Sequence, residues 1–306
     1  MNILVTGGAG FIGSHVADRF VEEGHNVIIL DNLSSGKEDN VNKKAKFYKI
    51  DIRDKEIEDI IFKRENIDCI NHHAAQISVR NSVDDPIYDG EINILGSLNL
   101  LQNAVKYGIK RVIFASTGGA IYGEQDYFPA DERHPLRPVS PYGVAKLSVE
   151  GYLYFYHTAY NLDYTVLRYA NIYGPRQDPH GEAGVVAIFT QKLLNNEQPV
   201  INGDGEQTRD YTFVGDIVEA NSLAFAKSFS GIFNIGTGVE CSVNELCNRL
   251  TKLINSGIVP LYGQPKLGEQ RRSVLDWNKI KGVSGWSPRS SLDKGLKETI
   301  DYFRRL

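Results

Sequence analysis

The chain has 306 residues, with 34 Lys and Arg against 38 Asp and Glu, so its formal net charge is −4. This slight acidity excludes the clustered excess of basic residues that nucleic-acid-binding proteins use, and a content of 42% hydrophobic and 24% charged residues excludes global disorder. No apolar run approaches the about 18 residues of a membrane span. Cys69, Cys241 and Cys247 fit neither a disulfide framework nor a zinc pattern. We therefore expect a reduced, cytoplasmic protein with no metal, and with neither nucleic acid nor membrane among its partners.

Short apolar runs alternate with helical segments through the first half of the chain. The runs are expected to be buried strands, and they are Ile3–Val5, Val27–Leu30, Phe47–Ile50, Cys69–His72, Val112–Ala115 and Thr165–Tyr169. The segments 11–23, 54–64, 87–107 and 142–160 are expected to be helices, as are two later ones, 185–195 and 243–254. This order predicts an α/β fold with a Rossmann-type doubly wound parallel sheet. Ligands bind beyond the carboxyl ends of the strands in such a sheet.

The first strand leads directly into a glycine-rich turn with the sequence Gly7-Gly8-Ala9-Gly10-Phe11-Ile12-Gly13. A strand, a GxGxxG turn and a helix in this order are typical of a dinucleotide site, because the glycines let the backbone approach a pyrophosphate and the helix N-terminus offers unpaired N–H groups. Asp31 closes the second strand, where a carboxylate accepts hydrogen bonds from ribose hydroxyls and repels a 2′-phosphate. The pattern therefore predicts NAD rather than NADP as the cofactor.

The loop after the second strand and the end of the third strand extend this predicted site. Asn32, Ser35 and Gly36 are placed where a loop can reach the adenosine. Asp51 follows the third strand, and two interpretations of it stay open: a contact with the adenine, or a solvated acid at a strand end.

The end of the fourth strand carries two adjacent histidines followed by small residues. Because successive side chains on a strand point to opposite faces, His72 and His73 cannot chelate one ion, and we expect them in the core or the pocket wall. Ala74, Ala75 and Gln76 follow, and the two alanines are small enough to let the backbone lie against a dinucleotide.

Tyr142 and Lys146 lie four residues apart at the start of a predicted helix, so the phenol and the ammonium share one face. Lowering the pKa of a tyrosine from about 10 to about 7 takes about 4 kcal/mol. One cation at about 4 Å supplies that order of energy at an effective dielectric constant of about 20. We therefore expect Lys146 and a positively charged nicotinamide to make Tyr142 a base near neutral pH.

The fifth strand ends in Ser116 and Thr117, which deliver a hydroxyl to the same crevice. The two residues alternate faces, so only one of them can point at a substrate. We expect it to be Thr117.

Seven motifs in order along the chain carry a family resemblance: TGGAGFIG, the strand ending at Asp31, HHAAQ, STGGAIYG, SPYGVAK, LRYANIYGPRQ and GDGEQTRDY. Together they resemble the extended short-chain dehydrogenase/reductases and, within that group, the UDP-glucose 4-epimerases (UDP-galactose 4-epimerases). The resemblance implies a Rossmann domain over 1–171, to which later segments return, and a smaller UDP-sugar-binding domain over 172–306. It also implies NAD-dependent epimerisation at C4 of a UDP-hexose through a 4-keto intermediate.

The resemblance further implies a role for individual positions. Tyr142 would be the acid and base at the sugar 4-oxygen, Lys146 would anchor the nicotinamide ribose, and Thr117 would hydrogen-bond the 4-oxygen. The NAD site would comprise Gly7, Gly10, Phe11, Ile12, Gly13, Asp31, Asn32, Ser35, Gly36, Asp51, Ile52, Ala74, Ala75, Gln76, Asn93, Tyr142, Lys146 and Tyr169. The UDP-sugar would be bound by Asn171, Val185, Val186, Val200, Asn202, Arg209, Lys266, Glu269 and Ser273.

Four departures from the better-known epimerases bear on the substrate. Thr117 replaces a frequent serine, Asn202 stands where an aromatic residue often packs near the uracil, and Lys266 with Glu269 replaces a usual Arg and Asp. Ser273 lies where some epimerases carry a tyrosine, and a small residue there leaves room for an N-acetyl group. We therefore expect UDP-N-acetylhexosamines to be accepted as well as UDP-hexoses.

Other functions remain open within and outside the enzymes. A UDP-glucuronate 4-epimerase or decarboxylase differs in one or two residues, whereas a 4,6-dehydratase would carry a carboxylate after Thr117, where this chain has Gly118 and Gly119. An NAD-binding sensor would lack Tyr142 or Lys146.

The segment 151–160 is aromatic around most of a helix, so we expect it and the helix at 92–107 to pair with their copies in a homodimer. Burial of this segment between domains is the alternative.

Overall fold

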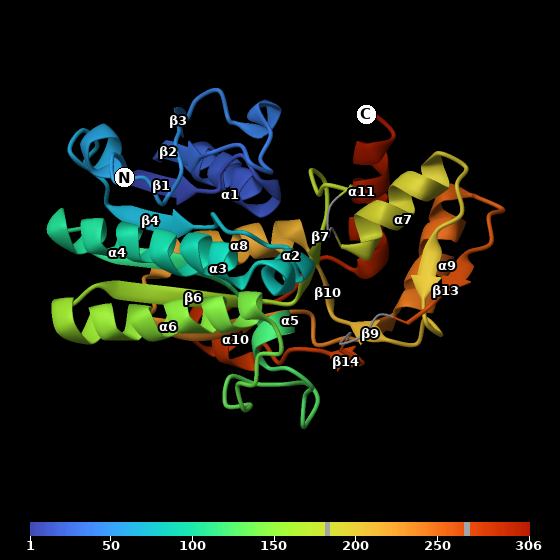
Figure 1. The fold of residues 1–306 in the computed structure, drawn as a ribbon. Coiled ribbons are helices and arrows are strands. Elements are labelled where there is room, and N and C mark those ends of the chain that lie inside the picture. Colours follow the sequence, from blue (N-terminus) through green and yellow to red (C-terminus); the bar gives the residue numbers. More distant parts are fainter. Residues whose placement is uncertain (181–183, 266–269) are drawn as a thin grey trace.

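A seven-stranded parallel sheet is the centre of the molecule (Figure 1). The computed structural model describes residues 1–180, 184–265 and 270–306. The strands lie in the order β11-β6-β5-β4-β1-β2-β3, with bounds β1 Asn2–Thr6, β2 Asn26–Asp31, β3 Lys46–Lys49, β4 Cys69–His72, β5 Arg111–Thr117, β6 Asp163–Tyr169 and β11 Gly231–Ile235. The order reverses between β1 and β4, and the predicted doubly wound sheet is confirmed.

Helices cover both faces of this sheet (Figure 1). One face packs against α1 Phe11–Glu22, α8 Val214–Lys227 and α10 Asn278–Ser284, and the other against α4 Ser97–Lys106 and α6 Pro141–Tyr160. The short helices α2 Val79–Asp84 and α3 Pro86–Gly90 pack against α6. The edge strand β3 is only half-buried, whereas the other five strands that the sequence predicts are almost fully buried in their interiors. Burial on both faces explains why they are continuous apolar runs rather than alternating patterns.

A smaller second part lies beyond the carboxyl ends of the strands. Its own apolar core joins helices that are far apart in sequence. It comprises β7 Asn171–Tyr173, α7 Val185–Leu194, β8 Val200–Asn202, β9 Thr208–Arg209, β10 Tyr211–Phe213, β12 Cys241–Ser242, α9 Val243–Ile254, β13 Leu261–Gly263, β14 Arg272–Ser273 and α11 Leu292–Phe303. Because α8, β11 and α10 return to the large sheet, a single cut near residue 171 does not separate the two parts.

Two of the predicted helices differ from the observed elements. Segment 54–64 contains only a short π-helical turn at Glu58–Phe62, and segment 87–107 is divided into α3, a π-helical turn at Glu91–Gly96, and α4. A Cβ at Gly96 would lie 2.6 Å from Ile52 Cδ1. The close approach of the helix to Ile52 at this point is not visible in the apolar periodicity. The remaining short helices are Glu38–Asn40 and α5 Gly118–Ile121.

Candidate active site

A cavity of about 690 Å³ lies at the carboxyl ends of the central strands, where the two parts of the molecule meet. Most of the predicted cofactor residues line it: Gly7, Gly10, Phe11, Ile12, Gly13, Asp31, Asn32, Ser35, Asp51, Ile52, Ala74, Ala75, Gln76, Tyr142, Lys146 and Tyr169. The sheet therefore brings together residues that are up to about 160 positions apart, as the reversal in strand order predicts.

The glycine turn after β1 has a shape that only glycine permits. Gly7 has φ +69°, and a Cβ on it would lie 2.6 Å from the Ala74 nitrogen. A Cβ on Gly13 would lie 2.2 Å from the Gly7 oxygen. No described side chain caps the N-terminus of α1 at Gly10, so its first N–H groups face the cavity and suit the pyrophosphate of NAD.

Asp31 closes β2 beside this turn. Its Oδ2 accepts a hydrogen bond from the Ala9 nitrogen at 3.0 Å, and its Oδ1 accepts one from the Leu33 nitrogen at 2.8 Å. Both oxygens are thus held by backbone, which fixes the carboxylate at the cavity wall. A carboxylate fixed there fits ribose hydroxyls and opposes a 2′-phosphate, so the residues present fit NAD.

Asp51 is tied to its neighbours at the same end of the cavity. Asn32 Nδ2 donates to Asp51 Oδ2 at 2.8 Å, and Arg53 Nε donates to Asp51 Oδ1 at 3.0 Å. Partial burial acts to raise the pKa of Asp51, but the hydrogen bonds from Arg53 and Asn32 outweigh it and the pKa is lowered. The carboxylate is therefore held ionised at the cavity wall rather than free in solvent.

Gly36 and Asn93 do not line the cavity, although both were predicted cofactor residues. A Cβ on Gly36 would lie 2.9 Å from Asp31 Oδ1, so this glycine makes room for the carboxylate. Asn93 is buried, accepts from the Gln76 nitrogen at 3.0 Å and donates to the Gln76 oxygen at 2.9 Å. Asn93 thus fixes the backbone of Gln76, which lines the cavity, without lining the cavity itself.

The two histidines lie on opposite sides, as predicted from strand alternation. His72 is in the core between Thr6 Oγ1 at 2.7 Å and Ser97 Oγ at 2.9 Å. His73 lines the cavity and stacks on Tyr169, with 6.4 Å between the ring centroids. Burial lowers the pKa of His73 to about 3, so it is neutral.

Tyr142 and Lys146 lie one turn apart at the start of α6, which Ser140 caps by accepting a hydrogen bond from the Gly143 nitrogen at 3.2 Å. Lys146 Nζ lies 5.9 Å from the centre of the Tyr142 ring and donates to the Ala115 oxygen at 2.9 Å. This places the ammonium at the end of β5, beside the phenol and inside the cavity wall.

Burial shifts the pKa values of both Tyr142 and Lys146 toward their uncharged forms. Burial raises the pKa of Tyr142, and the negative charge of Asp89 raises it further. Burial also lowers the pKa of Lys146 to about 8, which the charges of Asp89 and Glu150 partly offset. Lys146 alone therefore does not make Tyr142 a base, and a further positive charge is needed in the site.

Ser116 and Thr117 point in opposite directions at the end of β5. Ser116 Oγ donates to Glu150 Oε1 at 2.5 Å in the interior. A Cβ on Gly119 would lie 3.8 Å from Thr117 Oγ1 and 3.7 Å from Asn171 Oδ1, so these two polar atoms converge on one point. Within the described residues, Thr117 Oγ1 has no hydrogen-bond partner, which leaves it available to a ligand.

The predicted sugar and diphosphate residues lie on the short strands of the second part. Asn171 is on β7, and its nitrogen donates to the Asp210 oxygen at 3.0 Å. Arg209 on β9 and Ser273 on β14 are register partners, and Ser273 is buried. Lys266 and Glu269 lie outside the described residues.

The remaining predicted substrate residues differ in accessibility. Val200 is exposed and Asn202 half-buried on β8. Val185 and Val186 begin α7, where Val186 is fully buried in the core of the second part. Val186 therefore offers almost no surface to a ligand.

Further residues line the cavity for which the sequence predicted no role. Lys37, Asn40, Ser78, Asn81, Tyr88, Arg176 and Gln177 are among them. Arg176 and Gln177 belong to the motif LRYANIYGPRQ, which was the available signal. Lys37 and Asn40 reach the cavity because the loop after β2 folds back, with the Lys37 nitrogen donating to the Ala9 oxygen at 3.0 Å; no sequence pattern indicates this.

In the ranges that the structure describes, no group of three His, Cys, Asp or Glu side chains is arranged to hold a metal ion. Among the described helices, none combines the length and the apolarity that crossing a membrane requires.

Comparisons with known proteins agree with this geometry. Residues 3–236 match the NAD-dependent epimerase/dehydratase family. A putative UDP-glucose 4-epimerase of Methanocaldococcus jannaschii is 48% identical over 99% of this chain and 98% of its own length. The UDP-glucose 4-epimerase of Thermotoga maritima, solved with UDP-glucose, is 53% identical, with a TM-score of 0.98 over 100% of this chain and 99% of that one. The UDP-glucose 4-epimerase of Thermus thermophilus, solved with NAD, is 44% identical, with a TM-score of 0.94 over 99% of each chain.

Proposed function

The chain belongs to the NAD-dependent epimerase/dehydratase family, and we propose that it interconverts UDP-glucose and UDP-galactose by inverting C4 through a 4-keto sugar. One observation carries this proposal: Tyr142 and Lys146 form part of the same cavity wall as the glycine turn and Asp31, which fit NAD. A proton-transfer pair beside a hydride acceptor is the arrangement that oxidation of a sugar hydroxyl needs.

In this proposal the chain's own residues move the proton and hold the sugar. Bound NAD supplies a hydride acceptor at C4 and a positive charge beside the phenol. Tyr142 takes the proton of the 4-hydroxyl and later returns it, while Lys146 keeps a cation next to the phenolate. Thr117 Oγ1, which has no partner among the described residues, donates to or accepts from the 4-oxygen.

Inversion also requires the ketone to present its other face to the same hydride. Asn171 lies on β7 and Arg209 on β9 in the second part, and we propose that they hold the UDP diphosphate. Binding energy at this non-reacting end lets the sugar rotate without leaving the site.

The experiment is an assay with no added cofactor. Nucleotide released from the purified protein by denaturation is identified, and intact protein is offered UDP-glucose and UDP-glucuronate separately. We expect bound NAD and the formation of UDP-galactose. Inversion or decarboxylation of UDP-glucuronate with no turnover of UDP-glucose would establish the alternative substrate class instead.

We further propose that UDP-N-acetylglucosamine is a substrate, because the side chain at position 273 is small. Ser273 is paired in register with Arg209, which puts it beside the proposed diphosphate contact. We expect Ser273→Tyr to lower kcat/KM for UDP-N-acetylglucosamine by about tenfold or more while UDP-glucose changes less, because the added ring takes the space of the acetamide. Competition assays with both sugars measure this; bound NAD and the unfolding temperature serve as controls, and an equal loss for both sugars contradicts it.

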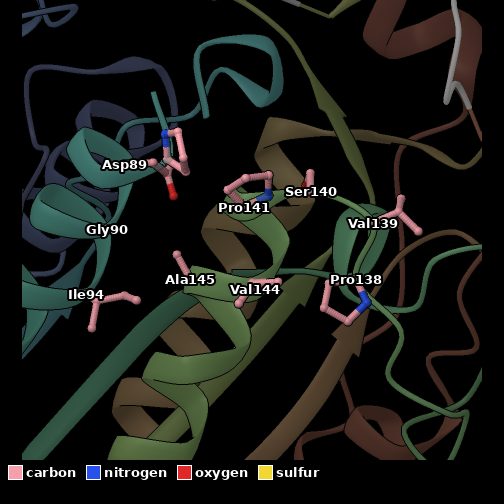
Figure 2. A pocket seen from close by; sticks show the side chains of 10 residues that line it. Asp89, Gly90, Ile94, Pro138, Val139, Ser140, Pro141, Val144 and Ala145 are labelled. Carbon is pink, nitrogen blue, oxygen red and sulfur yellow. The ribbon is translucent and has the colours of Figure 1, made fainter. Parts of the chain in front are cut away.

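We also propose that the chain is a homodimer built on α6 and the segment Glu91–Lys106. Tyr154, Phe155 and Leu95 are 64%, 51% and 58% exposed, so the aromatic face of α6 is not covered within the chain. At the start of the same helix, a groove of about 570 Å³ between α3 and α6 is lined mostly by apolar side chains, among them Ile94 and Val144 (Figure 2). Exposed apolar side chains gathered on one helix favour an interface.

A cytoplasmic location and a role in galactose metabolism complete the proposal. The three cysteines are free and buried, which suits a reducing compartment. Interconversion of UDP-glucose and UDP-galactose links galactose to the common hexose pool.

A further inference from the structure

Behind the proposed catalytic residues lies a buried network of Ser116, Tyr122, Glu150, Arg168 and Asn234, which the proposed chemistry does not use. Glu150 and Arg168 are 3% and 2% exposed, and Tyr122 and Asn234 are fully buried. Buried charges are costly unless they are paired and hydrogen-bonded.

Every charge in the buried network is paired. Arg168 Nη2 donates to Glu150 Oε2 at 2.6 Å, and Arg168 Nε donates to both carboxylate oxygens at 3.1 and 3.2 Å. Arg168 Nη1 donates to the Tyr122 hydroxyl at 2.9 Å, and that hydroxyl donates to Asn234 Oδ1 at 2.7 Å. The arginine is thereby fixed from two sides.

The buried network ties the catalytic helix to the catalytic strand. Tyr142, Lys146 and Glu150 follow one another at intervals of four residues along one face of α6. Lys146 holds the Ala115 oxygen at 2.9 Å, and Glu150 accepts from Ser116 Oγ at 2.5 Å. Two successive turns of α6 are therefore hydrogen-bonded to two successive residues of β5.

The residue that follows in β5 is Thr117. Because side chains alternate along a strand, turning Ser116 toward Glu150 turns Thr117 to the other side, where its Oγ1 lies near Gly119 and Asn171. Ser116 and Arg168 are also register partners in the β5–β6 pair. Glu150 therefore contacts the ends of both strands, β5 through Ser116 and β6 through Arg168.

We infer that Glu150 and Arg168 are positioning residues for the proposed 4-epimerisation, acting through Ser116 to set the place of Thr117 Oγ1 relative to Tyr142 and Lys146. This inference rests on the proposed function. It assigns the ion pair to the geometry of the reacting groups rather than to substrate or cofactor binding.

Ser116→Ala is the test, because it cuts the link to β5 and leaves the ion pair intact, so the protein is expected to fold. We expect kcat for UDP-glucose to fall by about tenfold, as misplacement of a reacting group by a fraction of an ångström does. KM, bound NAD and the unfolding temperature are expected to stay close to those of the wild type. Ser116→Thr, which restores the hydroxyl, is expected to recover most of the loss.

Ser148→Ala is the matched control, because Ser148 Oγ makes a comparable hydrogen bond to the Val144 oxygen on the solvent side of the same helix. Equal kcat values for Ser116→Ala and Ser148→Ala would overturn the inference. A joint fall of kcat, bound NAD and unfolding temperature would overturn it too, in favour of a purely structural role. Absence of 4-epimerisation by the wild type would be the failure of the proposed function itself, and the inference would fall with it.

Discussion

At the scale of single residues, the buried charge of Lys146 lowers the free energy of unfolding of the protein. Lys146 is 4% exposed, and burial lowers its pKa from an ordinary 10.5 to about 8. Below pH 8 the folded protein carries a buried ammonium, which costs about 3 kcal/mol by the size of this shift. The hydrogen bond to the Ala115 oxygen returns about 1 kcal/mol.

We therefore predict that Lys146→Met stabilises the NAD-free protein by about 2 kcal/mol at pH 7 while abolishing turnover. Between pH 8 and 10.5 the unfolded wild type binds more protons than the folded one, so its stability rises with pH and the advantage of the variant shrinks. Urea unfolding at pH 7 and pH 10 measures both. A wild type that is the more stable form at pH 7 would contradict the burial cost.

Asp31 decides between the two dinucleotides. Its carboxylate is held by the Ala9 and Leu33 nitrogens, so it cannot swing away from a 2′-phosphate. We predict that Asp31→Ala weakens NAD binding by about tenfold, through loss of the ribose hydrogen bonds, and removes the discrimination against NADP. Titration of the NAD-stripped protein with both dinucleotides measures the ratio; unchanged discrimination contradicts the assignment.

Individual residues of the site were predictable to different degrees. Strand ends indicated Asp31 and Thr117, and the four-residue spacing to Lys146 at the start of a helix indicated Tyr142, because those positions follow from backbone geometry alone. The raised pKa of Tyr142 was not predictable, since it depends on burial and on Asp89, which arrives from another helix. The role of Asn93 was not predictable either, because its hydrogen bond to the Gln76 nitrogen depends on tertiary packing.

At the scale of elements, α6 has two working faces. One carries Tyr142 and Lys146 toward the sheet, and the other leaves Tyr154 and Phe155 exposed. The sequence showed that the helix has more than one apolar face, but not whether the second face was covered by the chain itself.

We predict that Leu95→Glu combined with Phe155→Glu converts a dimer into a monomer, because two charges on each copy would be buried without partners in the interface. Light scattering at micromolar concentration measures the mass. Val283→Glu, which changes a 49% exposed residue on α10, is the control and is expected to stay dimeric. A wild type of monomeric mass would refute the dimer.

Elements defined by buried strands were predicted to within one or two residues, whereas segments 54–64 and 87–107 were not. Apolar periodicity reports which face is buried. It does not report the π-helical turns at Glu58–Phe62 and Glu91–Gly96, which come from local fit against neighbouring elements.

At the scale of the whole molecule, the site exists because the chain crosses between its two parts several times. The sheet and α6 provide the cofactor cradle and the Tyr142–Lys146 pair, and the short strands of the second part carry Asn171, Arg209 and Ser273, which we propose bind the UDP-sugar. The alternating strand–helix order predicted the first part. The second part, built from two- and three-residue strands, has no comparable signal in the sequence.

The central claim is that Tyr142 moves a proton at the sugar 4-oxygen beside a tightly bound NAD. The most direct measurement compares Tyr142→Phe with the wild type for bound NAD and for conversion of UDP-glucose without added cofactor. We predict equal NAD content and a loss of kcat by about a thousandfold, since a positioned acid–base group contributes about 10² to 10⁴ in rate. A variant that inverts the sugar at the wild-type rate, or a wild type with neither bound NAD nor turnover when NAD is supplied, would contradict the account.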